Sequence, residues 1–159
     1  MKSNLLLAGL LGSALLMGAF DCHAASWVKN DLDVPNKNVK ANYYDSDKVK
    51  THAKSLYWTE KFELTDFGAA AYTKHLAQFP VCQKNIAAKG EVTHHQLDFE
   101  IKEGKFRTIA KRNYTKDEKL VCTDKDMNNE LDTKWQEVVY KSPMYERYYL
   151  LATKYKFAY

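Results

Sequence analysis

The segment LDFEIKEGKFRTIAKRNY, residues 97–114, decides which fold class this chain can adopt. Its first six residues alternate between apolar and polar side chains, as the residues of a half-buried strand do. Glu103-Gly104 then supplies a turn, and Lys105–Tyr114 follows as the partner strand. Beyond a polar turn, Leu120–Cys122 offers a further short strand. The pattern therefore predicts an antiparallel hairpin near residues 96–122.

A helix is the alternative for the same segment. On a helical wheel, Phe99, Phe106 and Ile109 gather on one side. That arrangement places Gly104 in the middle of a helix, where glycine costs about 1 kcal/mol relative to alanine. We therefore prefer the hairpin and keep an all-α fold as the alternative.

Helix signals occur on both sides of the hairpin. The segments that place apolar residues at helical spacing behind a capping residue are 45–56, 65–79, 123–138 and 142–155. Pro80 is expected to stop the second of these helices, and Pro143 is expected to begin the last one. Together with the hairpin, these segments predict an α+β domain of about four helices and a small antiparallel sheet.

The first 24 residues have the composition of an export signal. Lys2 provides the positive start, residues 5–20 are apolar, and Ala24 is the small residue that a signal peptidase requires. An apolar run of about 16 residues is short for a membrane-spanning helix. We therefore expect a signal peptide over residues 1–24, a periplasmic or secreted protein, and no transmembrane segment after the signal is removed.

The rest of the chain has the length of one domain. Residues 25–44 are rich in Asn and Asp and show no sustained period, which predicts an extended N-terminal leader. Residues 45–159 are expected to form a single globular α+β domain.

The cysteines form a pair once the signal is removed. Cys22 leaves with the signal, and Cys82 and Cys122 remain in a compartment where thiols oxidise. A redox-active pair usually has two residues between its cysteines, and these two are much farther apart. The sequence therefore predicts a structural disulfide between Cys82 and Cys122.

The histidines do not indicate a metal site. None recurs with a cysteine at a spacing typical of metal ligands. The adjacent His94 and His95 would point to opposite faces of a strand, and we expect an exposed polar pair at a strand edge. No metal and no cofactor is predicted.

Positive charge is concentrated in one segment. The chain has a formal net charge of +4, and residues 105–119 hold six basic residues against Asp117 and Glu118. Regular alternation would put Arg107 and Lys111 on one face of a strand. Such a patch suits an anionic partner. The alternative is a solvated sheet face whose lysines discourage aggregation.

Exposed tyrosines are the second candidate for recognition. Tyr145 and Tyr149 fall outside the apolar stripe of the last predicted helix, and tyrosine is enriched at protein interfaces. The candidate partner-binding residues are Lys105, Arg107, Lys111, Arg112, Tyr145 and Tyr149. The expected partner is another protein with an acidic surface, and nucleic acid is an unfavoured partner outside the cytoplasm.

No catalytic motif is present in the sequence. There is no Gly-x-Ser-x-Gly, no phosphate-binding glycine loop and no His-Glu-x-x-His. The sequence therefore favours a small exported binding protein without catalytic residues, of the inhibitor or immunity type. The alternatives are a secreted enzyme or effector with a non-obvious site, and an envelope component or carrier of a small apolar ligand.

Overall fold

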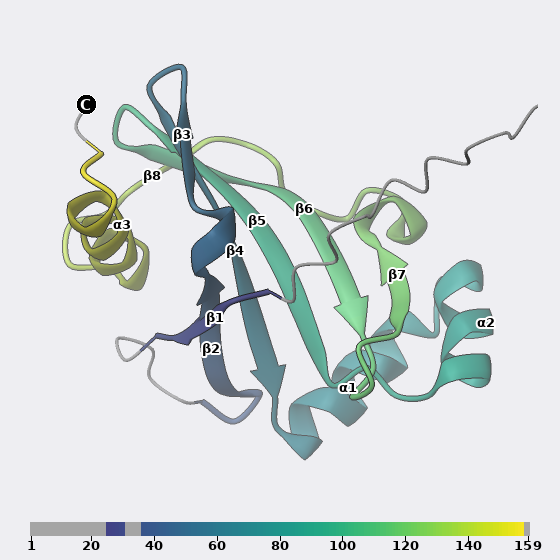
Figure 1. Cartoon of the computed structure of the whole chain (residues 1–159). Coiled ribbons are helices and arrows are strands. Elements are labelled where there is room, and N and C mark those ends of the chain that lie inside the picture. The colour runs from purple at the N-terminus through teal and green to yellow at the C-terminus, as the bar shows by residue number, and fades with distance from the viewer. Residues whose placement is uncertain (1–24, 31–35, 158–159) are drawn as a thin grey trace, which may run out of the picture.

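The computed structural model describes residues 25–30 and 36–157, and the expected signal peptide lies outside this range. The described chain forms an eight-stranded antiparallel sheet with three α-helices (Figure 1). The strands are β1 (Trp27–Lys29), β2 (Val39–Asp45), β3 (Lys50–His52), β4 (Ser55–Leu64), β5 (His94–Lys102), β6 (Lys105–Tyr114), β7 (Leu120–Thr123) and β8 (Gln136–Glu137). The helices are α1 (Asp66–Leu76), α2 (Pro80–Lys89) and α3 (Pro143–Lys154), with 3₁₀ turns η1 (Ser46–Lys48) and η2 (Asp124–Met127). The strand order is β1-β2-β4-β5-β6-β7, with β3 paired to β4 and β8 paired to β6.

The fold is mostly β, so the predicted domain of about four helices with a small sheet is wrong. The all-α alternative is wrong as well, because the segment 97–114 forms the hairpin of β5 and β6. Its turn is Glu103-Gly104, as predicted, and both residues have positive φ angles of 49° and 73°. β7 also forms where a further short strand was predicted.

Residues 45–56 form η1, β3 and the start of β4 in place of the predicted helix. Ala53 and Lys54 have φ angles of 47° and 64°, which two-residue hairpin turns require and helices exclude. The apolar residues Val49, Ala53 and Leu56 are spaced as on a helix, but they lie in different parts of this hairpin. Val49 precedes β3, Ala53 lies in the turn, and Leu56 belongs to β4. The residues expected to be an extended leader contribute β1 and β2 to the sheet.

The predicted helix over residues 123–138 reduces to the short turn η2. Asn128 and Asn129 follow it with φ angles of 57° and 58°. Two successive residues in the left-handed region end a helix, and asparagine tolerates that region better than most residues.

Two helices begin at the predicted caps. The Thr65 hydroxyl accepts a hydrogen bond from the Gly68 amide (3.0 Å) before α1, and Ser142 accepts one from the Tyr145 amide (3.2 Å) before α3. Pro80 occupies the first turn of α2, where its missing N–H costs nothing, so it begins a helix where it was expected to end one.

The predicted disulfide between Cys82 and Cys122 is present, and the two Cα atoms lie 5.3 Å apart. Cys82 lies in α2 and Cys122 in β7, so the bond ties α2 to the sheet. The chain after Cys122 continues into the short turn η2 and not into the helix predicted over residues 123–138.

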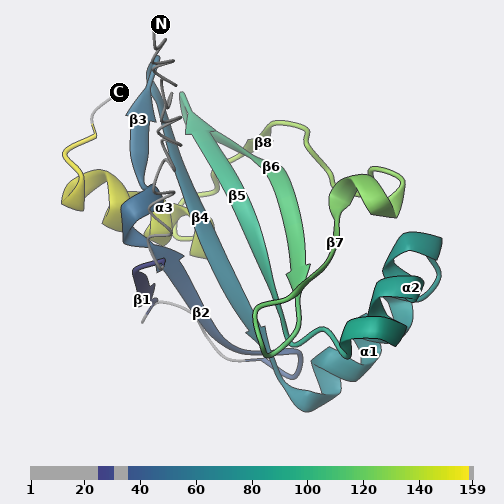
Figure 2. The ribbon, with the colours of Figure 1, turned by 45° about the vertical axis from the view of Figure 1, so that its right-hand side comes forward.

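Strand alternation gives the sheet two faces. The inner face carries Leu56, Trp58, Glu60 and Phe62 of β4 and is covered by the helices, while the outer face carries the odd-numbered side chains of β4. α3 covers one end of the inner face, and α1 with α2 covers the other (Figures 1 and 2). The core at the α3 end consists of Tyr44, Leu56, Trp58, Phe99, Ile101, Tyr148, Leu151 and Ala152. The core at the other end consists of Leu64, Ala69, Leu76, Phe79, Cys82, Val92, Val121, Cys122 and Met127.

A buried ion pair attaches α3 to the sheet. The Glu60 carboxylate accepts hydrogen bonds from Trp58 Nε1 (2.6 Å) and Asn42 Nδ2 (3.0 Å), and Arg147 Nη1 of α3 lies 2.8 Å from it. Arg147 Nη2 also donates to Asn42 Oδ1 (3.1 Å). The Glu60 carboxylate is fully buried, so its charge depends on these donors.

Replacing Arg147 with Met tests this attachment. We expect the free energy of unfolding to fall by about 3–5 kcal/mol, because a buried carboxylate loses its counter-charge. Adding Glu60→Gln to Arg147→Met should restore part of that loss. Lys40→Met is the matched control, since Lys40 is exposed and lies 3.8 Å from Glu63 in a surface pair worth about 0–1 kcal/mol. Urea denaturation measures all four proteins, and equal losses for Arg147→Met and Lys40→Met would contradict the role of the buried pair.

Candidate functional site

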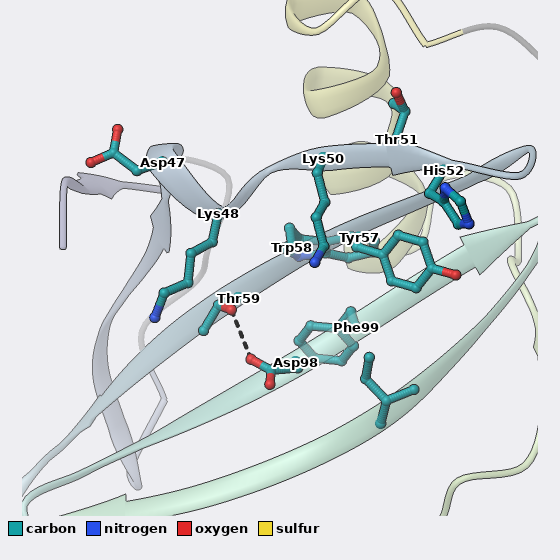
Figure 3. A pocket seen from close by; sticks show the side chains of 11 residues that line it. Asp47, Lys48, Lys50, Thr51, His52, Tyr57, Trp58, Thr59, Asp98 and Phe99 are labelled. Carbon is teal, nitrogen blue, oxygen red and sulfur yellow. Dashed lines mark hydrogen bonds between the residues drawn. The ribbon is translucent and has the colours of Figure 1, made fainter. Parts of the chain in front are cut away.

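A pocket of about 720 Å³ lies on the outer face of the sheet (Figure 3). Residues 47–52 of η1 and β3 form its rim, and Tyr57, Thr59 and Asp98 form its floor together with Ile109. Trp58 and Phe99 border the same strands from behind, where their rings stack on the inner face at a centroid distance of 5.2 Å. This volume is typical of small-ligand and peptide-side-chain pockets.

The path of β2 and β3 creates the rim. β2 pairs with β4 only as far as Tyr44 opposite Glu60, and the Asp45 side chain then caps η1 by accepting from the Asp47 amide (3.1 Å). β3 takes the vacated edge of β4, with Lys50 opposite Tyr57. The rim is therefore a tight hairpin beside the floor.

The acidic groups near the floor are already paired. Asp98 accepts two hydrogen bonds from Arg112 (2.5 and 2.6 Å) and one from Thr59 (2.7 Å). Burial alone would raise the pKa of Asp98, but these hydrogen bonds outweigh burial and hold the pKa below its ordinary value. The carboxylate is thus an ionised, fully bonded acceptor with little tendency to take a proton.

Glu100 repeats this arrangement one step along the sheet. It accepts from Tyr57 (2.7 Å), Ser55 (2.9 Å) and Arg107 Nε (2.8 Å). Burial raises its pKa, and the hydrogen bonds from these three residues lower it further than burial raises it. On the outer face, each of these two carboxylates is therefore neutralised by its own arginine, Asp98 by Arg112 and Glu100 by Arg107.

The rim carries lysines that form no hydrogen bond with the carboxylate on the floor. Lys48 and Lys50 are exposed, and Figure 3 shows both side chains extending from the rim toward the floor. Lys50 Nζ lies 6.0 Å from the centre of the Tyr57 ring, and Lys48 Nζ lies 3.5 Å from the Asp45 carboxylate. His52 follows on the same strand, while the rim carboxylate of Asp47 accepts a hydrogen bond from Ser26 (2.6 Å). The pocket can therefore bind an anionic group at its rim.

The predicted basic residues of β6 lie on two different faces. Cross-strand partners share a face, and Arg107 and Arg112 pair with Glu100 and Gln96 on the outer face. Lys111 pairs with Leu97 and lies on the inner face, where its Nζ is 4.6 Å from the centre of the Tyr72 ring. The expectation that Arg107 and Lys111 share a face is wrong, because a bulge between them inserts one residue and inverts the alternation.

The other candidate residues are also dispersed. Lys105 forms an ion pair with Glu137 of β8 (3.3 Å), and Arg107 stacks on Trp135 (4.7 Å). Tyr145 and Tyr149 lie together on α3, with ring centroids 6.4 Å apart, and α3 covers the inner face. The six residues thus do not form one surface: Arg107 and Arg112 lie on the outer face, Lys111 on the inner face, and Tyr145 with Tyr149 on α3. Their binding of a partner stays a prediction.

Sequence reasoning missed Lys48, Lys50 and His52. The available signal was the run from Lys48 to Lys54, which holds three lysines and one histidine without an acidic residue. Interpreting residues 45–56 as a helix distributed these side chains around a wheel, whereas the hairpin gathers them on one rim.

His94 and His95 point to opposite faces, as expected, but they are not an exposed pair. His94 is buried, stacks on Tyr114 at 5.4 Å and lies 3.1 Å from Glu118. Burial lowers its pKa, and Glu118 partly opposes that shift. His95 packs on the inner face against Phe62.

The described ranges 25–30 and 36–157 contain no group of three or more His, Cys, Asp or Glu side chains placed to hold a metal ion. No helix in these ranges is long and apolar enough to cross a membrane.

The Asp98–Arg112 pair gives a prediction about acid stability. Because the pKa of Asp98 is lower in the folded state than in the unfolded one, the pair stabilises the fold above about pH 4 and loses this effect as the pH falls further. Arg112→Gln should lower the free energy of unfolding by about 1–3 kcal/mol at pH 7 and flatten its decline between pH 5 and 2. Denaturation at a series of pH values measures both effects. The exposed Lys125→Gln is the control, and an unchanged acid decline in Arg112→Gln would refute the assignment.

Comparison with protein-family models, with curated proteins and with solved structures finds no match for this chain. No relative therefore informs its activity.

Proposed function

We propose that this protein is an exported binding protein that takes an acidic segment of a partner protein into the pocket beneath β3. The cationic rim above a charge-balanced floor carries this proposal. Lys50 extends from the rim toward the floor, and Lys48 lies beside it, 3.5 Å from Asp45. On the floor Asp98 is engaged by Arg112, and the neighbouring Glu100 is engaged by Arg107. An incoming carboxylate therefore meets cations at the rim and no unpaired negative charge on the floor.

The same arrangement favours a peptide carboxylate over nucleic acid. A phosphate backbone binds through many cations along its path. On the outer face the long arginines are engaged by Asp98 and Glu100, so few cations are available beyond the rim. A short acidic segment needs only two or three cations to bind. The Tyr57 ring offers such a segment an apolar contact.

The pocket is better equipped for binding than for acid–base chemistry. A general acid or base works best with a pKa near the operating pH. Asp98 and Glu100 have lowered pKa values and fully engaged oxygen atoms. They fix the orientation of Arg112, Thr59 and Tyr57 and give the pocket a constant shape.

An inhibitor or immunity role follows from the same geometry. The β3–β4 hairpin projects from the end of the sheet (Figure 1), so a partner bound at the rim would be covered by the hairpin and by the strands beneath it. Steric occlusion of the partner's own cleft needs no chemistry from this chain. The Cys82–Cys122 disulfide is compatible with work outside the cytoplasm.

Charge reversal of the rim tests this function. A fluorescein-labelled peptide rich in Glu and Tyr is the probe, and fluorescence anisotropy at 20 to 300 mM salt is the measurement. Lys48→Glu/Lys50→Glu should weaken binding at least about tenfold and remove most of its salt dependence, because steering by cations is lost.

The matched control is Lys74→Glu/Lys84→Glu, which changes the net charge equally on the exposed surfaces of α1 and α2. The proposal requires the control to bind nearly as the unaltered protein does. Equal weakening in both double variants would show that only overall charge matters and would overturn the assignment of the pocket.

A further inference from the structure

A second cavity, of about 400 Å³, lies on the inner face beneath α1. Its walls combine aliphatic side chains with three rings, and they include Val39, Leu64, Ala71, Tyr72, His75 and His95. None of the described residues that line it is Asp, Glu, Lys or Arg. This composition is opposite to that of the pocket on the outer face.

The cavity is bounded by fixed contacts. The Thr65 amide donates to the Asn38 carbonyl (2.9 Å), which holds the start of α1 against the segment before β2. A Cβ atom at Gly68 would overlap the same carbonyl oxygen, so only glycine permits this approach. The wall formed by α1 and Val39 is therefore built into the backbone.

His95 is the polar group of this cavity. Its ring lies between Phe62 (5.2 Å) and Tyr72 (5.6 Å) on the inner face. Nδ1 is buried and has no hydrogen-bond partner among the described residues, so the ring of His95 lines the cavity with a polar nitrogen that the surrounding side chains leave unsatisfied.

The cavity presents His95 as a neutral ring. Burial, with a smaller contribution from the charge of Lys111, lowers the pKa of His95 to about 3. At physiological pH the imidazole can donate or accept one hydrogen bond without carrying charge. His75 lies at the edge of the cavity, where its Nε2 is 3.2 Å from Glu130 and is engaged outside it.

We infer that this cavity binds a small uncharged molecule with an apolar body and one hydroxyl-like group directed at His95. Apolar cavities of about 150 Å³ already hold benzene, so 400 Å³ accommodates one substituted ring or a branched aliphatic chain. A hydroxyl matches an imidazole nitrogen in either tautomer because it both donates and accepts. A charged group would lose its hydration without a counter-charge among the lining residues, because Lys111 lies outside the lining, over the Tyr72 ring. This site lies on the opposite face from the pocket beneath β3 and is independent of the function proposed for that pocket.

Three ring compounds of nearly equal shape test the inference on the oxidised protein. These are p-cresol, which has a hydroxyl, p-xylene, which replaces it with a methyl group, and p-toluate, which carries a carboxylate. Titration calorimetry measures affinity, and amide chemical shifts of ¹⁵N-labelled protein locate the site. We expect p-cresol to bind about fivefold more tightly than p-xylene, the value of one neutral hydrogen bond, and p-toluate to bind least.

Three variants separate the contributions of shape and polarity. Ala71→Trp should abolish binding by filling the mouth of the cavity, and Ala70→Trp, on the neighbouring exposed position of α1, should leave it unchanged. His95→Phe preserves the stacked ring and should bring p-cresol and p-xylene to equal affinity. Absence of p-cresol binding, equal effects of the two tryptophans, tighter binding of p-toluate, or a hydroxyl preference that survives in His95→Phe would each overturn the inference.

Discussion

The buried pair of Glu60 and Arg147 is the constraint on which the arrangement of the inner face depends. A carboxylate on the central strand β4 can remain ionised and buried only if donors converge on it. Trp58 and Asn42 approach from the sheet itself, and Arg147 must come from α3. This requirement fixes the position of α3 over one end of the face, while the disulfide fixes α2 at the other end. The cavity beneath α1 lies within the α1 and α2 end of the same face.

The two faces of the sheet have opposite chemistry because the strands alternate. On the outer face, Asp98 and Glu100 are each engaged by an arginine and a hydroxyl group. On the inner face, the cavity beneath α1 is lined by aliphatic side chains and rings. One inserted residue in β6 decides to which face Lys111 and Arg112 belong, since strand alternation has a period of two. The bulge thus divides a continuous basic segment between two surfaces.

Local signals in the sequence were sufficient for the β5–β6 hairpin, for the caps at Thr65 and Ser142, and for the Cys82–Cys122 bond. The hairpin and the caps depend on neighbouring residues, and the bond joins the two cysteines of the described residues. They were insufficient for β4. Glu60 occupies an inner-face position where alternation calls for an apolar residue, and its partner Arg147 lies far along the chain. A pair of residues so far apart in the sequence leaves no local pattern. The strands within residues 39–64 were therefore not predicted and are known from the tertiary structure.

The candidate site illustrates why a charged segment is a weak guide to a binding surface. With the turn at residues 103–104, strand pairing places Arg107 opposite Glu100. Arg107 therefore forms an ion pair within the hairpin and is not available to a partner. On β3 the cross-strand partners of Lys50 and His52 are Tyr57 and Ser55, which carry no charge. Lys50 therefore keeps a charge that no cross-strand partner neutralises. Net charge along the chain makes residues 105–119 the first candidate for binding an anionic partner. When the charges that cross-strand partners neutralise are left out, the β3 rim becomes the first candidate.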